Sequence, residues 1–303
     1  MKIIGYLLLI CIFLTGHALC SQGQNDGTIR IGVSASGFDN LNANDIAAAL
    51  KVWGNTVGGE MGLTQVDVRL FPRHVNELRA AVDEYRPDGI SVTVPEYLDI
   101  GLKVPEVYIA ANENGPAISY VVIVGKETGI SSPEDLSGRK LVIGKDRRMD
   151  LARPWLQTLM TDKTGKPHQS TFQTPKVVEN PSKAILQVFF RQADAALVVS
   201  EAFDLACELN PQLRKKLRVV AESPPFITAL FVFPHRVDRT QKTNKLKHAI
   251  LNLYSSPNGR QVLTVFKSSQ IKRYPVSVLD STIQFVEHYR RVVTGTSPLE
   301  TRP

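Results

Sequence analysis

A short basic segment, residues 144–150, carries the side chains best suited to hold an anion. It reads Gly-Lys-Asp-Arg-Arg-Met-Asp and directly follows an apolar stretch, residues 140–143, that we expect to be a strand. Arg147 or Arg148 could clamp a carboxylate or a phosphoryl group through two parallel hydrogen bonds, a geometry that lysine does not offer. The alternative is that these cations are solvated surface charges.

Polar and aromatic side chains also follow two other predicted strands, at residues 28–34 and 90–94. These candidates are Ser34, Ser36, Phe38, Thr93, Glu96 and Tyr97. Ligands of α/β proteins collect at the carboxyl ends of parallel strands, so these positions are expected to face a ligand. An ordinary polar loop is the alternative for the first three, and a helix cap or a packing role is the alternative for Glu96 and Tyr97.

Signatures of catalysis are missing from the sequence. It contains no glycine-rich dinucleotide motif, no Walker loop, no nucleophile elbow and no HExxH zinc motif. The six histidines are scattered, and of the three cysteines only Cys207 lies deep in the chain. We therefore expect a binding protein instead of an enzyme, with no cofactor, no metal and no disulfide.

The segments that would position these residues alternate between strand and helix. Residues 28–94 read as β-α-β-α-β, with helices at 45–58 and 75–85 and a middle strand at 66–71. A second series follows, and its strands and helices are expected at 119–124, 140–143, 152–161, 176–179, 195–199, 217–221 and 228–233. After Pro234 we expect three helices, at 245–254, 257–266 and 281–293. The fold class is therefore α/β.

Composition and the N-terminus indicate an exported protein with a folded core. Of 303 residues 43% are hydrophobic, and 36 Lys+Arg against 29 Asp+Glu give a net charge of +7 that is spread along the chain. Without a basic tract or a basic helix with interleaved aromatics, no nucleic-acid partner is expected.

Lys2 followed by an apolar run at residues 3–14 predicts a secretory signal peptide over residues 1–20 and a periplasmic location. A lipid anchor on Cys20 is the rival interpretation.

The chain resembles the phosphate- and phosphonate-binding periplasmic proteins of ABC transporters. Residues 133–144, Pro-Glu-Asp-Leu-Ser-Gly-Arg-Lys-Leu-Val-Ile-Gly, are similar to the DLxGKxVxxG stretch of that family. Residues 192–197, Gln-Ala-Asp-Ala-Ala-Leu, resemble its GxxDAA strand entry, and residues 119–130 resemble the entry strand into its second lobe. The resemblance extends from about residue 28 to residue 289.

This resemblance implies a type 2 periplasmic binding fold with a ligand cleft between two lobes. Lobe 1 would comprise residues 28–117 plus 228–303, and lobe 2 residues 118–227, with hinges near 116–119 and 225–229. The implied function is capture of a small, phosphate- or phosphonate-like anion by a monomer, which then meets a membrane permease. A sensor that presents its closed form to a receptor kinase is the alternative, and an enzyme on the same fold would need a catalytic set that the sequence lacks.

The resemblance also shows where this chain departs from the family pattern, and it adds two candidate site residues. In the family the loop after residue 143 is rich in serine and threonine, whereas here three cations replace the hydroxyls. The next predicted helix starts Asn-Pro-Ser, at residues 180–182, where phosphonate binders often have a histidine. Ser200 and Glu201 match positions that face the cleft in relatives, although a helix cap is an equal alternative. The identity of the ligand stays open.

Overall fold

The computed structural model describes residues 28–38, 43–60, 62–63, 65–165, 175–234, 240–265 and 267–294. The expected signal peptide and Cys20 lie outside these residues. No helix in the described ranges combines the length and the apolar character that a bilayer crossing requires.

Alternating strands and helices open the chain as the sequence pattern predicts. The elements are β1 (Ile29–Ser34), α1 (Ala43–Glu60), β2 (Val66–Phe71), α2 (Val75–Tyr85), β3 (Gly89–Thr93) and α3 (Val94–Ile100). Strand β1 pairs in parallel with β2 on one side and with β3 on the other. The apolar faces of α1 and α2 account for this arrangement, because Ile46, Leu50, Leu78 and Val82 are all buried.

Three further strands complete a six-stranded sheet. They are β4 (Glu106–Ala111), β10 (Ala229–Val232) and β11 (Gln270–Pro275), and the strand order is β11-β4-β10-β3-β1-β2. The prediction of three helices after Pro234 did not include β11, which adds an antiparallel edge strand beside β4. Its sequence, Gln-Ile-Lys-Arg-Tyr-Pro, is mostly polar and exposed, so it has no apolar alternation that would predict a strand. Strand β4 was also missing from the prediction.

The five-stranded sheet is built from the middle of the chain, in the order β7-β6-β8-β5-β9. Its strands are β5 (Tyr120–Gly125), β6 (Leu141–Gly144), β7 (Lys176–Val178), β8 (Ala195–Val199) and β9 (Leu217–Glu222). Helices α4 (Ala152–Thr164), α5 (Pro181–Phe189), α6 (Ser200–Leu209) and α7 (Pro211–Lys216) surround it. Every residue of β8 is buried, since helices cover both faces, and this explains its unbroken apolar run.

The six-stranded sheet with its helices forms one layer, and the five-stranded sheet with its helices forms the other. Two crossing segments, one containing Ile118 and the other Phe226, connect these layers. They pair with each other, because Ile118 N donates to Phe226 O (2.9 Å) and Phe226 N donates to Ile118 O (2.8 Å). Helices α8 (Thr240–Leu251) and α9 (Pro257–Val265) then cover the six-stranded sheet.

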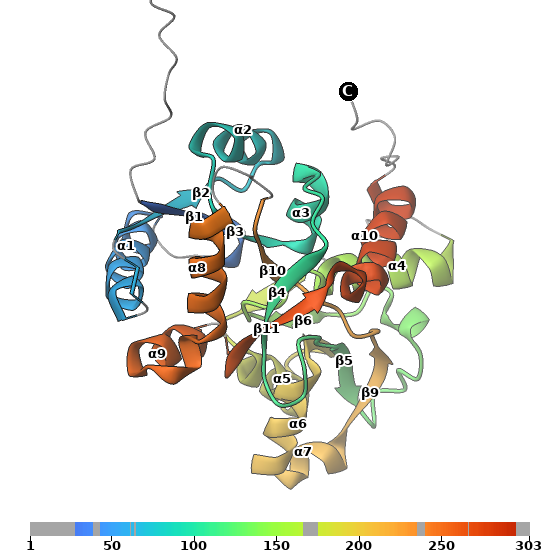
Figure 1. Cartoon of the computed structure of the whole chain (residues 1–303). Coiled ribbons are helices and arrows are strands. Elements are labelled where there is room, and N and C mark those ends of the chain that lie inside the picture. The colour runs from blue at the N-terminus through green and yellow to red at the C-terminus, as the bar shows by residue number, and fades with distance from the viewer. Residues whose placement is uncertain are drawn as a thin grey trace, which may run out of the picture.

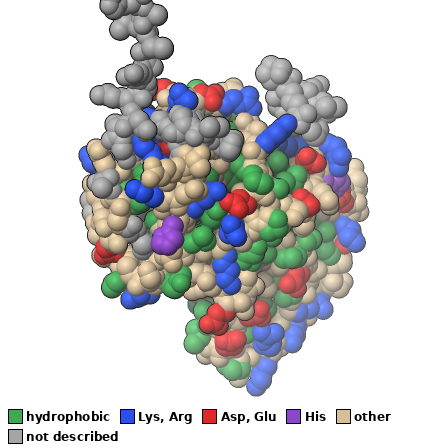
Figure 2. Space-filling model, in the orientation of Figure 1, with side chains coloured by type: hydrophobic (Ala, Val, Ile, Leu, Met, Phe, Trp, Pro, Cys, Tyr) green, Lys and Arg blue, Asp and Glu red, His purple; other side chains and the backbone are tan. Residues whose placement is uncertain are grey.

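The C-terminal helix α10 (Asp280–Tyr289) contacts both layers (Figure 1). Thr282 Oγ1 accepts a hydrogen bond from Ile227 N in the second crossing segment (3.0 Å). Farther along, Val286 belongs to the hydrophobic cluster of the five-stranded sheet, and His288 Nε2 lies 2.9 Å from Asp162 Oδ2 on α4. Helix α10 therefore packs beside the second crossing segment and against the five-stranded layer. Over the face of the molecule seen in the same orientation, Lys and Arg side chains are interspersed with Asp and Glu side chains (Figure 2).

Candidate functional site

A cavity of about 120 Å³ lies between the two sheets. The six-stranded sheet contributes polar side chains from the carboxyl ends of β1 and β3 and from the start of β10: Ser34, Ser91, Thr93 and Thr228. The five-stranded sheet contributes the loop after β6, with Arg147, Arg148 and Asp150. The crossing segment supplies Gly115, Pro116 and Ile118. The cavity is thus at the strand ends where ligands of α/β proteins bind.

Three hydroxyl groups on the side of the six-stranded sheet, those of Ser34, Ser36 and Thr93, converge on one buried carboxylate, that of Glu96. Its Oε1 accepts hydrogen bonds from Ser34 Oγ (2.5 Å) and Ser36 Oγ (2.6 Å). Its Oε2 accepts from the backbone N (2.8 Å) and the Oγ1 (3.0 Å) of Thr93. Glu96 is only 5% exposed, so these four bonds are what satisfies its charge inside the protein.

These bonds change what the hydroxyls can offer a ligand. A hydroxyl has one hydrogen, and those of Ser34, Ser36 and Thr93 are donated to Glu96. Ser34 and Thr93 therefore have no hydroxyl hydrogen left to donate to a ligand in the cavity, whereas an anion needs donors. Ser36 does not line the cavity; its hydroxyl donates to Glu96 and its backbone N donates to Ser34 Oγ (3.1 Å).

Glu96 and Thr93 form a capping box at the start of α3. Thr93 Oγ1 accepts from Glu96 N while the Glu96 carboxylate accepts from Thr93 N, with Pro95 in the first turn. The helix-cap alternative for Glu96 is confirmed, and the cap ends β3 at Thr93, one residue before the predicted end. Tyr97 is 6% exposed and packs in the hydrophobic cluster of the six-stranded sheet, away from the cavity lining. The side chain of Phe38 lies outside the described part of the structure.

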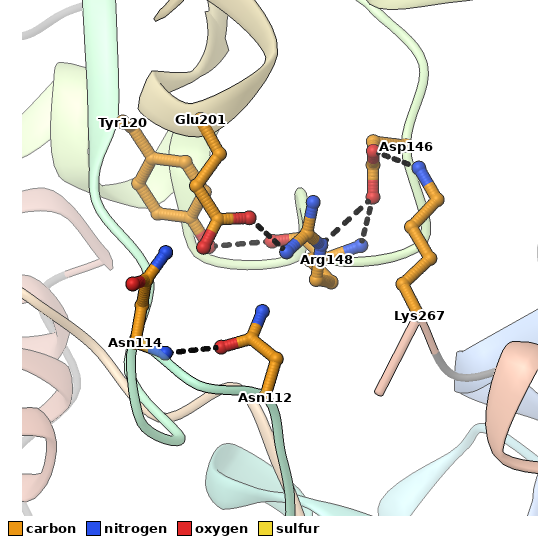
Figure 3. A network of polar contacts seen from close by, with 7 residues as sticks. All are labelled: Asn112, Asn114, Tyr120, Asp146, Arg148, Glu201 and Lys267. Atoms are coloured by element: carbon orange, nitrogen blue, oxygen red, sulfur yellow. Dashed lines mark hydrogen bonds and ion pairs between the residues drawn. The ribbon is translucent and has the colours of Figure 1, made fainter. Parts of the chain in front are cut away.

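The basic loop after β6 forms an ion-pair network that Figure 3 shows from close by. Arg148 Nη1 lies 2.8 Å from Glu201 Oε2, and Arg148 Nε lies 3.4 Å from Asp146 Oδ1. Tyr120 donates its hydroxyl hydrogen to Arg148 O (2.7 Å), which fixes the loop against β5. With 19% of its side chain exposed, Arg148 is not a solvated surface charge.

Asp146 also binds a cation from the six-stranded layer. Lys267, which follows α9, donates from Nζ to Asp146 Oδ2 (2.5 Å). Burial of Asp146 raises the pKa of its carboxyl, but the hydrogen bonds from Lys267 and Arg148 outweigh it, so the net pKa is below the ordinary value. Lys267 has a φ of 50°, in the left-handed region that costs a non-glycine residue about 1 kcal/mol. Its side chain joins the two layers at the edge of the cavity.

The structure brings together some of the predicted site residues and separates others. Ser34, Thr93, Arg147 and Arg148 line the cavity, and Glu201 reaches it only through Arg148. Ser200 is the first residue of α6 and donates its backbone N–H to Ser119 O (2.9 Å). The sequence analysis did not identify Lys267, Asp146 or Asn112 as site residues. Asn112 lines the cavity, and its side-chain oxygen accepts a hydrogen bond from Asn114 N (3.1 Å) (Figure 3).

Metal binding receives no support within the described ranges. No group of three or more His, Cys, Asp or Glu side chains in that part of the chain is placed to hold an ion.

Gly144 lets the basic loop leave β6 beside the start of α5. A Cβ on Gly144 would lie 2.6 Å from Pro181 Cα, which is backbone and cannot turn away. Gly144→Ala is therefore expected to lower the free energy of unfolding by about 2 kcal/mol through overpacking, measured by urea denaturation. Gly59→Ala is the control, because nothing lies within 4 Å of a Cβ there. Equal stability of the two variants would contradict the close packing of β6 on α5.

The fold is shared with solved binding proteins. Two sheets joined by paired crossing segments, with a cavity between them, define a type 2 periplasmic binding protein. A binding protein component of an ABC phosphonate transporter from Pseudomonas aeruginosa superposes with a TM-score of 0.55 at 15% identity, covering 88% of this chain and 87% of that one. A Xanthomonas citri protein bound to ATP gives 0.59 at 14% identity, over 88% and 98% of the chains. PhnD1 from Prochlorococcus marinus in complex with methylphosphonate gives 0.53 at 14% identity, over 86% and 97%.

The sequence itself identifies the family. The model for phosphonate ABC transporter periplasmic substrate-binding proteins matches residues 101–275, more than half of the chain. The chain therefore belongs to this family of substrate-binding proteins, as its motifs predicted. Among curated proteins, none matches the sequence.

Proposed function

We propose that this protein captures a small, phosphate- or phosphonate-like anion between two lobes and delivers it to the permease of an ABC importer. Lobe 1 comprises residues 28–117 plus 228–303, and lobe 2 residues 118–227. The observation that carries the proposal is the cavity between the sheets, which receives Lys267 from one layer and Arg147 and Arg148 from the other.

The charges predict where the anionic group of the ligand lies. Ser34 and Thr93 donate their hydroxyl hydrogens to Glu96, so the cationic groups that an anion can meet in the cavity are Lys267 and, on the opposite side, Arg147 and Arg148 in the basic loop. A guanidinium group there presents a planar pair of N–H groups that matches two oxygens of a phosphonate. We therefore place the anion against Arg147, between Arg148 and Lys267.

Capture would work by closure of the lobes about the crossing segments. A ligand that contacts cations of both lobes binds the closed state more tightly than the open state, and this differential affinity shifts the population. A permease that recognises the closed form then receives only loaded protein. The protein acts as a monomer in this scheme, and no chemical change of the ligand is required.

A thermal-shift series tests the proposal. Methylphosphonate, phosphate, sulfate, acetate and glycine are each added to the purified protein at equal ionic strength, with sodium chloride as the control. A ligand at 100 times its Kd adds about 2.7 kcal/mol to the free energy of unfolding, which for a protein of this size raises Tm by roughly 4 to 5 °C. A series in which no oxyanion exceeds the chloride control contradicts the proposal.

A further inference from the structure

We infer that the ligand carries an apolar substituent, an alkyl chain or an aryl ring, which enters a second cavity next to the cleft. This inference rests on the proposed function, because it assigns the anionic group to the cleft cavity and the hydrocarbon group to its neighbour.

The second cavity lies inside lobe 1 and has a volume of about 180 Å³. One wall is a face of the six-stranded sheet, and the others are α1, α8 and α9. The lining is hydrocarbon almost throughout, with side chains such as Ile31, Val68, Leu246 and Ile250. Among the described lining residues, polar side-chain atoms come only from Ser91 and Tyr108, and the Tyr108 hydroxyl is already donated to Glu106 Oε1 (2.7 Å).

The two cavities adjoin. Val33, Ser91, Ala110 and Ala229 line both of them. These four residues lie at the cleft ends of β1, β3, β4 and β10, on the sheet face that α1, α8 and α9 cover. Three of them are small, so little side-chain bulk separates the polar cavity from the apolar one. A group that leaves the polar cavity along this sheet face meets hydrocarbon in the described lining beyond Ser91, apart from Tyr108, whose hydroxyl is donated to Glu106.

Collapse of the apolar cavity is prevented by the contact between α1 and β2. Gly54 and Gly58 already lie so close to the sheet that a Cβ on either would be 2.6 Å from a methyl group of Val68 or Val66. Helix α1 therefore cannot move closer to β2 to fill the space. Protein interiors rarely leave apolar spaces of this size empty, because every lining atom loses packing contacts.

The volume sets the size of the substituent. A hydrocarbon-lined cavity of about 150 Å³ stays dry and binds benzene. The cavity in lobe 1 is somewhat larger and would hold a phenyl ring or a chain of about six carbons. No Lys or Arg lines this cavity in the described part of the chain, so nothing there calls for a second anionic group.

Calorimetric titration with methyl-, propyl-, butyl- and phenylphosphonate tests the inference. Each methylene that enters the cavity is expected to tighten binding about fourfold, so butylphosphonate should bind roughly 50-fold more tightly than methylphosphonate. The matched variants are Ala249→Leu and Ala48→Leu. Ala249 is buried on α8 and lines only the apolar cavity, whereas Ala48 is exposed on α1 and lines neither.

The readout is the ratio of the butyl- to the methylphosphonate affinity. Ala249→Leu fills the cavity and is expected to reduce this ratio at least tenfold, while Ala48→Leu keeps the wild-type ratio. Binding of methylphosphonate with no gain for longer chains overturns the inference and leaves the proposed function intact. Failure of every phosphonate to bind overturns the inference, and the thermal-shift series with phosphate then decides the proposed function separately. A wild-type gain that Ala249→Leu does not reduce places the chain elsewhere and also overturns the inference.

Discussion

Replacing Glu96 by alanine is expected to lower the free energy of unfolding by about 3 kcal/mol. The substitution removes the acceptor of four hydrogen bonds and leaves the buried hydroxyl of Ser34 and the buried N–H and hydroxyl of Thr93 without that partner. Each unsatisfied buried donor costs about 1 to 3 kcal/mol, and loss of the capping interaction on α3 adds to this. Calorimetry should show a fall in Tm of roughly 5 °C.

Glu96→Gln separates the charge of this residue from its packing. A glutamine amide can donate to the oxygens of Ser34 and Ser36 while its carbonyl accepts from Thr93, so the expected loss of stability is only about 1 kcal/mol. The hydroxyl hydrogen of Ser34, which lines the cavity, then becomes available to a ligand, and the affinity for an anion should rise. If Glu96→Ala melts within 2 °C of the wild type, the convergence of the hydroxyls on Glu96 is not what holds this side of the site.

Arg148→Ala and Glu201→Gln are expected to change anion affinity in opposite directions. Arg148 lines the cavity, while Glu201 Oε2, 2.8 Å from its Nη1, neutralises it from outside the cavity lining. Removing the guanidinium loses a charge-assisted hydrogen bond, which weakens binding about 10- to 100-fold. Removing the negative charge of Glu201 frees Arg148 for the ligand and should strengthen binding about threefold to tenfold.

Both variants should lose stability, so stability alone does not distinguish their roles. Arg148→Ala also takes one partner from the buried Asp146, and we expect a loss of about 2 kcal/mol. Arg148→Lys is the intermediate control, because it keeps the charge but not the planar pair of N–H groups. Calorimetric titration with methylphosphonate gives the affinities. If Arg148→Ala binds as the wild type does, the network around Asp146 only holds the loop.

The sequence by itself determined the α/β class, the family and most elements. Strand β2, helix α2 and strand β8 have the predicted bounds because local signals define them: a helical period in α2, an apolar run in β8 and punctuating glycine or proline between elements. The basic loop was found for the same reason, since three cations directly after a strand are visible without any partner.

The partners of the site residues were decided only by the tertiary structure. Ser34 and Glu96 are 62 residues apart and Asp146 and Lys267 are 121 apart, and neither pair has a periodic or motif signal that connects its members. The hydroxyls were expected to bind the ligand, but in the structure they donate their hydrogens to a buried carboxylate. A buried carboxylate needs hydrogen-bond donors, and only the packing of the strands determines which donors lie next to it. Strand β11 likewise forms because β4 offers it a free edge, although its own sequence is mostly polar.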